Sequence, residues 1–369
     1  MNIGMAYFEF GGMKGVARVA AELTRQMIAR GHDVHFYCAE LPPNQVETGV
    51  NFHRVNAVNS FSTLGLASFA IAAGRGMRRG RHTVTHSHGN IIGADVITAH
   101  SCHKAGVRVF APRDNRGIAD LVRLRLEQKN YGEKQFKKVI AVSNGVQREL
   151  MHEYNLTSDN IVVIPNGVDC DRFSPSRRNT ARTSTRLQLG FSPDDLVMIF
   201  VANEFERKGL SFLLDALSLV RHNDVKLLVV GDDKEMPRFA RRANDLKVGP
   251  RTVFAGSIKN VEDYYAASDA FVFPTFYEAF SLATLEAAAA GLPLLATNVN
   301  GTEDLIQDGH NGLFVSRDAD DIAAKIRLMV EDQELRKYLG ANARITAQQY
   351  SWDIITDLTL NVYEEVARR

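Results

Sequence analysis

Short hydrophobic runs alternate along the chain with stretches in which apolar residues recur at helical spacing. In the first part, a hydrophobic run at 3–8 precedes a glycine-containing segment at 11–15. Val19, Leu23 and Met27 then share one face of a predicted helix, and a second hydrophobic run follows it. This order of strand, helix and strand is typical of an α/β domain with a parallel sheet.

The same alternation begins again near the middle of the chain. A predicted strand at 196–202 is followed by a predicted helix at 209–221 and by another hydrophobic run. Before it, Asn166-Gly167 is a turn signal, and the stretch 174–186 is low in apolar residues, as linkers are. The pattern therefore predicts two α/β domains, with the boundary in this region.

A strand, a loop and a helix follow one another in the second half. The hydrophobic run 270–273 ends at Pro274, because proline has no N–H to give to a sheet ladder. Ser281 can cap a helix over 282–290, which consists mostly of strong helix formers. Gly291 then supplies a left-handed end to that helix.

Two carboxylates lie in this segment, Glu278 just before the helix and Glu286 within it. The N–H groups of Phe280, Ser281 and Leu282 at the helix N-terminus attract phosphate. An acid that can accept sugar hydroxyls beside such a helix end indicates a nucleotide-sugar site.

Two further loops offer groups to a phosphate. Arg207 and Lys208 follow a predicted buried strand, and they supply a planar guanidinium and a compact ammonium. Gly11 and Gly12 allow the backbone to approach a ligand closely. A dinucleotide-binding loop is the alternative there, but Phe10 stands where its first glycine is expected.

Histidines lie at the ends of two predicted strands. His86 and His88 share one face of a strand, but no third metal ligand lies at a convincing position, so we expect no metal site. His100 follows the hydrophobic run 96–99 at the carboxyl end of a strand, where open α/β sheets bind ligands. We therefore expect His100 in a binding site, with His103 as the weaker candidate.

Two basic segments each allow two interpretations. The stretch 60–73 is apolar and small, and arginines follow it at positions 75, 78, 79 and 81. Residues 104–138 are rich in arginine and lysine, which the acidic residues there offset only in part. Each segment is either the solvated side of a helix or a surface that contacts an anionic acceptor or a membrane.

The composition is that of an ordinary globular protein. A chain of 369 residues suits two domains, and a formal net charge of +1 argues against a dedicated nucleic-acid-binding protein. Cys38, Cys102 and Cys170 are far apart and not at zinc spacing, which favours a reduced, cytoplasmic setting. The N-terminus has no basic leader and no apolar run reaches the roughly 18 residues that a bilayer requires. We therefore expect a chain that neither crosses a membrane nor is exported by a signal peptide.

Several segments resemble a known family. The sequence at 278–286, Glu-Ala-Phe-Ser-Leu-Ala-Thr-Leu-Glu, resembles the Glu-x7-Glu segment of the family 4 retaining glycosyltransferases, which have the two-domain GT-B fold. The segment 165–175 resembles the hinge phrase of that family, Pro-Asn-Gly-Val-Asp followed by Phe and Pro. Residues 7–12 and the Arg-Lys-Gly at 207–209 look like the lipopolysaccharide core glucosyltransferases, although the family's usual Arg-x4-Lys pattern is replaced by adjacent cations.

The resemblance covers essentially the full length and implies a fold. It implies two facing Rossmann-like domains with the site in the cleft between them. The N-terminal domain, residues 1–168, would lie on the acceptor side and include a crossing helix at 350–369. Residues 169–349 would bind the nucleotide sugar.

The resemblance also implies roles for the candidate residues. Arg207, Lys208 and the backbone of Gly12 would stabilise the departing diphosphate. Glu286 would accept the ribose hydroxyls and Glu278 the sugar hydroxyls. The remaining implied contacts are the backbone at Ile258 with the base and His100 beside the donor sugar.

We therefore expect a retaining, metal-independent hexosyltransferase without a cofactor. It would move a hexose from a nucleoside diphosphate sugar, with UDP-glucose first, to a hydroxyl of a cell-surface glycan or lipid-linked acceptor such as lipopolysaccharide core. We expect it in the cytoplasm, with peripheral contact to the inner membrane. The alternatives are a GDP-mannose-dependent enzyme, a non-catalytic nucleotide-sugar-binding protein, a NAD-dependent oxidoreductase, and a phosphorylase or epimerase of the same fold.

Overall fold

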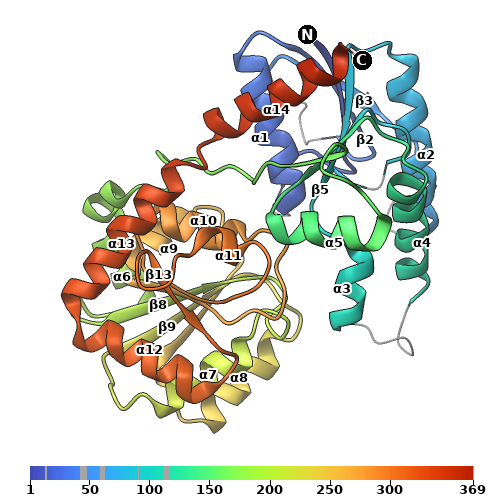
Figure 1. The fold of residues 1–369 in the computed structure, drawn as a ribbon. Helices are drawn as coiled ribbons and strands as arrows, with labels where there is room; N and C mark the ends of the chain where they lie inside the picture. Colours follow the sequence, from blue (N-terminus) through green and yellow to red (C-terminus); the bar gives the residue numbers. More distant parts are fainter. Residues whose placement is uncertain (13–14, 42–47, 59–62, 90, 111–116, 369) are drawn as a thin grey trace. The chain divides into compact units, whose positions relative to one another are not determined.

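The structure is a computed structural model of residues 1–369, and it describes all of them except 13–14, 42–47, 59–62, 90, 111–116 and 369 (Figure 1). Its contacts divide the chain into two units. Unit 1 consists of Met1–Gly167 together with Trp352–Arg369, and unit 2 is Val168–Ser351. The sequence had placed these boundaries at 168/169 and 349/350.

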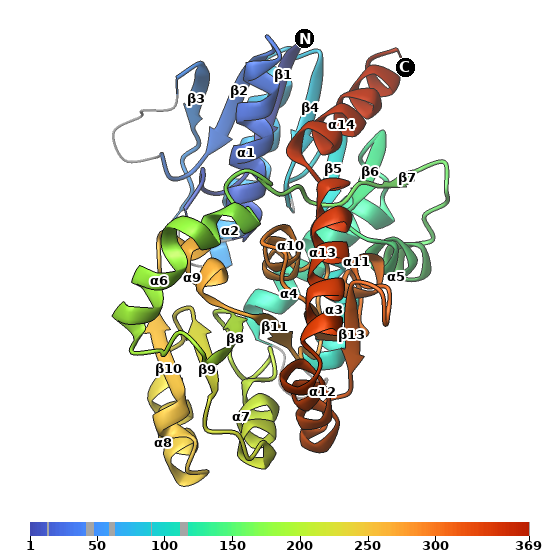
Figure 2. The same cartoon turned by 90° about the vertical axis from the view of Figure 1, so that its left-hand side faces the viewer.

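Unit 1 is built on a parallel sheet with the strand order β3-β2-β1-β4-β5-β6-β7, and Figure 2 shows β3, β2, β1, β4 and β5 following one another across it. The strands are β1 (Asn2–Ala6), β2 (Asp33–Cys38), β3 (Val50–Arg54), β4 (Val84–Ser87), β5 (Val96–Ala99), β6 (Lys138–Ala141) and β7 (Ile161–Val163). Its helices are α1 (Gly15–Ala29), α2 (Thr63–Arg79), α3 (His103–Phe110), α4 (Ile118–Glu127), α5 (Asn144–Tyr154) and α14 (Trp352–Ala367), with a π-helical turn at Gln128–Gly132. The βα alternation expected from the sequence is confirmed.

The last helix, α14, belongs to unit 1 and lies beside α1 (Figure 1). Its side chains Ile355, Val362, Tyr363 and Val366 are buried in the same core as β1 and α1. At Gly167, where the chain leaves unit 1, a Cβ atom would lie 2.5 Å from the Trp352 ring, so only glycine fits there. The return of the final helix to the first domain is therefore confirmed, and apolar burial holds it in place.

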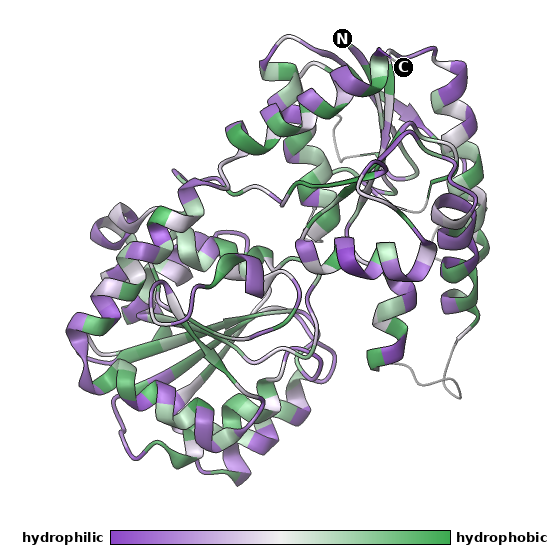
Figure 3. Ribbon diagram, viewed as in Figure 1, coloured by the Kyte–Doolittle hydropathy of each residue, from purple (hydrophilic) through white to green (hydrophobic). Residues whose placement is uncertain are grey.

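Unit 2 is built on a second parallel sheet, with the order β10-β9-β8-β11-β12-β13. The strands are β8 (Leu196–Val201), β9 (Val225–Val230), β10 (Thr252–Gly256), β11 (Ala270–Phe273), β12 (Leu294–Thr297) and β13 (Gly312–Val315). The helices are α6 (Arg178–Leu189), α7 (Leu210–Leu219), α8 (Met236–Asp245), α9 (Val261–Ala267), α10 (Leu282–Ala289), α11 (Thr302–Leu305), α12 (Ala319–Glu331) and α13 (Gln333–Gln348), with 3-10 turns at Pro175–Arg177 and Gly249–Arg251. The strands of this sheet are strongly hydrophobic, as expected for a parallel sheet that helices cover on both faces (Figure 3).

The polar stretch 174–186 is not a linker, and that prediction was wrong. It forms the turn before α6 and most of α6 itself. The helix is fixed through charge instead of apolar burial: Arg182 and Arg186 each lie 2.6 Å from a carboxylate oxygen of Asp269. Arg186 also donates to the carbonyl of Ala267 at the end of α9. A segment with few apolar residues is therefore part of the domain because its arginines find buried acceptors.

The first of the two basic segments contains α2, a helix that covers the sheet of unit 1. Phe69, Ala73 and Met77 are buried on its inner face, and Arg78 donates to the carbonyl of Ile92. The beginning of the apolar stretch at 60 and the part of the second basic segment at 111–116 lie outside the described residues. In the part of the chain that is described, no helix is both long and apolar enough to cross a membrane.

Candidate functional site

Each sheet has one point where the strand order reverses. In unit 2 the chain runs outward from β8 through β9 to β10, and on the other side from β11 through β12 to β13. The loops that follow β8 and β11 therefore diverge at the carboxyl edge of the sheet, where open parallel sheets bind ligands. In unit 1 the corresponding point lies between β1 and β4. Arg207, Lys208 and Glu278 follow β8 and β11 at the first of these points, Gly11 and Gly12 follow β1 at the second, and Ile258 and His100 follow the other strands β10 and β5.

In unit 2, the segment after β11 forms a capped helix N-terminus. Ser281 is the N-cap of α10, and its Oγ accepts a hydrogen bond from the N–H of Thr284 at 3.1 Å. The left-handed Gly291, with φ of 72°, follows the end of the helix, as predicted. Glu278, Phe280 and Ser281 are buried. The N-terminal N–H groups of α10 consequently concentrate positive potential beside the Glu278 carboxylate.

Lys208 and Glu278, which lie on different loops, are in direct contact. The Lys208 ammonium donates to Glu278 Oε1, and both side chains are almost fully buried. The ammonium also lies 5.5 Å from the centre of the Phe273 ring, a favourable cation–π geometry. Burial lowers the pKa of Lys208, and the Glu278 carboxylate opposes that effect. The structure thus joins two residues that the sequence assigned separately to diphosphate and sugar.

Arg207 has different partners from its neighbour. Its Nε donates to Glu204 Oε2 at 2.9 Å, and its Nη1 donates to the carbonyl of Tyr277 at 3.3 Å. Because the Glu204 carboxylate is 62% exposed, water competes for it and the pair holds Arg207 only weakly. The hydrogen bond to Tyr277 therefore holds the guanidinium at the candidate site, and a ligand can replace its exposed partner Glu204.

Two glycines let the loops of unit 2 approach one another. At Gly209, with φ of 84°, a Cβ atom would lie 2.0 Å from the carbonyl oxygen of Pro274. At Gly301, with φ of 76°, it would lie 2.6 Å from the Cα of Phe280. Any other residue at either position would push a neighbouring loop away from the carboxyl edge of the sheet.

Glu286 is buried in the middle of α10. The hydroxyl of Tyr265, on α9, lies 3.2 Å from Glu286 Oε2 and 3.2 Å from the carbonyl of Ala283. Tyr265 itself is fully buried, so its hydroxyl holds the Glu286 carboxylate in one position. Ile258 lies in the loop between β10 and α9, at the same edge of the sheet. Leu282 is the first residue of α10.

In unit 1, Gly11 and Gly12 follow β1 and both have left-handed backbone, with φ of 70° and 86°. A Cβ atom at Gly12 would meet nothing within 4 Å, so backbone conformation and not crowding favours glycine there. Phe10 is buried, and its ring packs edge-on against Phe36 and Phe52. The residue that replaces a dinucleotide fingerprint glycine is thus a core residue.

Three histidines form a chain of contacts behind the carboxyl edge of the unit 1 sheet. His88 Nδ1 lies 3.1 Å from His100 Nε2, and the rings of His86 and His88 are 4.3 Å apart. His86 in turn contacts the Thr98 hydroxyl at 2.7 Å and the Tyr363 hydroxyl at 2.5 Å. The candidate residue His100 is therefore oriented by His88 and, behind it, by α14.

Burial keeps these histidines neutral. It lowers the pKa of His86 and of His100 to about 3, and it lowers that of His88 further, with His86 and His100 adding to the effect. His88 Nε2 is buried and has no hydrogen-bond partner among the described residues. An unpaired buried N–H costs more than an unpaired acceptor, so His88 is best placed with its proton on Nδ1, donating to His100. His100 then carries its own proton on Nδ1.

His103, the weaker candidate, lies apart from this chain of contacts. It begins α3, and its Nε2 is 3.2 Å from a carboxylate oxygen of Asp120. Among the described residues no group of three or more histidine, cysteine, aspartate or glutamate side chains could hold a metal ion.

The structure adds residues that the sequence interpretation did not single out. Glu204 contacts the candidate Arg207, Tyr265 contacts the candidate Glu286, and Tyr363 contacts His86, which lies behind His88 and His100. Glu204 lies three positions from Arg207, a spacing that could have suggested the pair. Tyr265 and Tyr363 gave no such signal, because their contacts depend on how helices pack.

Two family models match the chain, one for each half. The model described as Glycosyltransferase Family 4 matches residues 13–172, and the model described as Glycosyl transferases group 1 matches residues 181–346. Together the two ranges account for most of the 369 residues.

Curated proteins match over the full length at modest identity. The N-acetyl-alpha-D-glucosaminyl L-malate synthase of Bacillus anthracis is 27% identical, over 100% of this chain and 98% of that protein. A D-inositol 3-phosphate glycosyltransferase of Geodermatophilus obscurus is 28% identical, over 97% of this chain and 86% of that protein.

Solved structures share the fold. WaaG, described as a glycosyltransferase involved in lipopolysaccharide biosynthesis, superposes with a TM-score of 0.86 at 20% identity and covers 98% of this chain and 99% of its own. Anabaena HepE, solved with UDP and glucose, gives a TM-score of 0.76 at 18% identity and covers 99% of both chains. The chain therefore belongs to the glycosyltransferases, with a family 4 domain followed by a group 1 domain in the GT-B fold.

Proposed function

We propose that this glycosyltransferase moves a hexose from a nucleoside diphosphate sugar, with UDP-glucose as the first choice, to a hydroxyl of a cell-surface glycan or lipid-linked acceptor such as lipopolysaccharide core. The observation that carries the donor part is the contact of Lys208 with Glu278 beside the N-terminus of α10. A cation, a carboxylate and free helix N–H groups at one edge of a sheet suit a ligand that joins a diphosphate to a sugar. The complex of HepE with UDP and glucose supports the choice of donor.

The proposed chemistry depends on stabilising the leaving group. Negative charge builds on the diphosphate as the bond to the sugar breaks, and Arg207, Lys208, the helix N-terminus at Ser281 and the Gly12 backbone would stabilise it. A preorganised donor of this kind contributes roughly 3–4 kcal/mol to lowering the barrier. Since Lys208 has a carboxylate partner already, a diphosphate would share the ammonium with Glu278, which would also accept sugar hydroxyls.

We propose that transfer retains the configuration of the sugar and requires no divalent cation or cofactor. The fixed cations would perform the charge stabilisation that a metal provides in other transferases. The departing phosphate itself would act as the base for the acceptor hydroxyl on the same face of the sugar, as the family resemblance implies. His100, neutral and oriented by His88, would donate to a sugar hydroxyl.

For the acceptor, we propose a glycan or lipid-linked substrate reached at the cytoplasmic face of the membrane. Helices α3 and α4 of unit 1 present exposed Val109, Ile118 and Leu121 together with the exposed Arg123 and Arg125. Apolar side chains among arginines suit the surface of an anionic bilayer. The name of WaaG, a protein of lipopolysaccharide biosynthesis, supports this class of acceptor.

Donor hydrolysis without acceptor tests the proposal. The purified protein is incubated with UDP-, GDP- and ADP-sugars in the presence of EDTA, and release of free nucleoside diphosphate is recorded. Release from UDP-glucose is the expected result. When a simple acceptor is added, the anomeric configuration of the glycoside that forms reports whether transfer proceeds with retention. Release from GDP-mannose alone would show that the donor is GDP-mannose and not UDP-glucose. Nucleotide binding without release, also in the presence of lipopolysaccharide core acceptor, would indicate a binding protein instead.

A further inference from the structure

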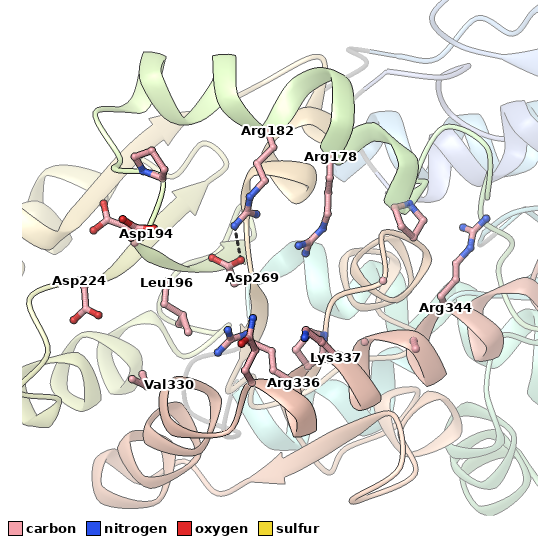
Figure 4. Close-up of a pocket in the computed structure, with 18 of the residues that line it drawn as sticks. Arg178, Arg182, Asp194, Leu196, Asp224, Asp269, Val330, Arg336, Lys337 and Arg344 are labelled. Atoms are coloured by element: carbon pink, nitrogen blue, oxygen red, sulfur yellow. Dashed lines mark hydrogen bonds and ion pairs between the residues drawn. The ribbon is translucent and has the colours of Figure 1, made fainter.

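A second polar cavity lies at the opposite edge of the unit 2 sheet from the candidate donor site. It has a volume of about 840 Å³ and is lined where β8, β11 and β12 begin, by residues such as Leu196, Asp269 and Pro293. The carboxylates of Asp194, Asp195 and Asp224 also line it, and Figure 4 shows Asp194 and Asp224 beyond Leu196, away from Arg178. The donor residues follow the carboxyl ends of β8 and β11, so the length of a strand separates the two sites. The cavity is within the size range of small-molecule sites.

Helices α6 and α13 supply arginines to this cavity from two sides. Figure 4 shows Arg178 and Arg182, from α6, and Arg336, from α13, extending toward the same space around Asp269. On α6, positions 178, 182 and 186 share one face, and like charges at this spacing repel one another. A column of three arginines therefore needs a compensating negative charge.

Asp269 compensates only part of that column. Its two carboxylate oxygens are each 2.6 Å from a guanidinium, one from Arg182 and the other from Arg186. In the described part of the chain, neither Arg178 nor Arg336 has a carboxylate within 4.0 Å. Their hydrogen bonds there are one from Arg178 to the carbonyl of Ser268 and one from Arg336 to a backbone carbonyl.

The surroundings of Arg178 make this charge costly. Burial lowers the pKa of the Arg178 guanidinium, and Arg182, Arg186 and Arg336 lower it further, whereas Asp269 opposes them. An arginine stays protonated under such conditions. An anion in the cavity would relieve the repulsion and would use donors that have no protein acceptor.

We propose that this cavity binds a small molecule with at least two phosphate groups, one held by Arg178 and the other by Arg336. Guanidinium forks bind phosphate through paired hydrogen bonds, and the two arginines come from opposite walls, so a single bridging ligand satisfies both. Lys337 adds a further cation to the cavity lining, with an exposed side chain that pairs with Glu334. The site is independent of the donor site and of the proposed reaction.

Inorganic pyrophosphate is the probe for a calorimetric titration. All titrations use an Arg207→Ala background, because pyrophosphate would also bind the donor site. Adding Arg178→Gln and Arg336→Gln is expected to weaken pyrophosphate binding by about tenfold or more, since each change removes charge-assisted hydrogen bonds. Adding Arg241→Gln, which removes an exposed arginine of α8 outside the cavity, leaves the affinity unchanged. Inorganic phosphate, titrated in parallel, binds more weakly than pyrophosphate.

A variant that leaves both arginines in place separates a loss of binding from a loss of folding. Lys337→Gln alters only an exposed side chain and is expected to weaken pyrophosphate binding by about threefold, the size of a surface charge interaction. Unchanged affinity in both the arginine and the lysine variants would overturn the proposal. So would an absence of pyrophosphate binding in the Arg207→Ala background, or equal affinities for phosphate and pyrophosphate.

Discussion

Arg207 and Lys208 are adjacent in the sequence but have different surroundings. Lys208 is almost fully buried against Glu278 and Phe273, whereas the Arg207 fork pairs with the exposed Glu204. A buried ion pair fixes geometry, and an exposed one is exchanged at low cost. Arg207 can therefore exchange its protein partner for a diphosphate at a smaller cost in free energy than Lys208.

Arg207→Ala is expected to lower turnover by about an order of magnitude or more, because a charge-assisted contact to the leaving diphosphate is lost. The measurement is kcat and KM for transfer or donor hydrolysis. Arg238→Ala is the matched control, since that exposed arginine pairs only with Glu206 and Glu235 among the described carboxylates and lies outside the candidate site. Wild-type kcat/KM in the Arg207 variant would exclude the assigned role.

The histidines of unit 1 are expected to make its stability fall in acid. Their pKa values in the folded protein are below the value near 6.5 of an unfolded chain. Between about pH 3 and 6.5 the unfolded state thus binds more protons, so the free energy of unfolding falls as the pH is lowered, by up to about 1.4 kcal/mol per pH unit for each histidine.

Urea unfolding of the wild type and of His100→Gln at pH 6.5 and 5.0 measures this dependence. Replacing His100 also removes its effect on the pKa values of His86 and His88. The difference between the two slopes therefore reports His100 together with this effect on its two neighbours. The variant is expected to lose less stability over this interval. Identical slopes would show that His100 is protonated in the folded state as readily as in the unfolded one.

At the level of the helix, α6 is held to its domain by charge. Most of its residues are polar, and its buried arginine, Arg186, donates to Asp269 and to several backbone carbonyls. Such a helix has little apolar area to bury, so its attachment depends on complete hydrogen bonding of the guanidinium.

Arg186→Ala is expected to reduce the free energy of unfolding of unit 2 by about 3–5 kcal/mol, because it leaves buried acceptors and part of the Asp269 charge without a partner. Chemical unfolding monitored by circular dichroism provides the value. Arg238→Ala, which breaks two exposed ion pairs and the contact of Arg238 with the neighbouring Phe239 ring, is expected to cost less than about 1 kcal/mol. Similar losses in the two variants would show that α6 does not depend on its buried arginine.

Helices α3 and α4 give a second prediction at this level. Ile118 and Leu121 are 74% and 55% exposed, and they lie beside arginines. Leu121→Glu is expected to weaken binding to phosphatidylglycerol-containing vesicles by about tenfold, since it removes apolar burial and adds a repelled charge. Leu187→Glu is the control, because Leu187 is 81% exposed on α6 of the other unit. Equal vesicle binding by both variants and the wild type would argue against a membrane surface here.

For the molecule as a whole, the chain passes through all of unit 2 before it supplies the last helix of unit 1. Unit 1 includes Trp352–Arg369, so its core closes only when α14 has returned. Tyr363 is fully buried in that core and contacts His86 through its hydroxyl.

Tyr363→Ala is expected to destabilise unit 1 by about 3–5 kcal/mol through the cavity that it creates. Tyr363→Phe, which removes only the hydroxyl, should cost about 1–2 kcal/mol. Scanning calorimetry of the full chain checks both, and the transition assigned to unit 2 should not move. A shift of both transitions by the same amount would mean that the two units unfold as one.

Much of the fold was predictable from local patterns. Alternating hydrophobic runs and helical periodicity marked the strands and helices of both sheets, and Ser281 and Gly291 marked the two ends of α10. These signals act over a few residues, so they can be recognised without knowing the fold. The stretch 174–186 misled because its stability comes from Asp269, which is more than 80 residues away.

The candidate site was predictable as a set of residue types and only partly as an arrangement. Glu278, Glu286, Arg207 and Lys208 stood out by their places next to strands and helix ends, where ligands bind. The pairing of Lys208 with Glu278 and the support of Glu286 by Tyr265 join segments about 70 and 21 positions apart. Secondary structure follows from nearest neighbours along the chain, whereas such contacts exist only once the sheet order has brought distant loops to one edge.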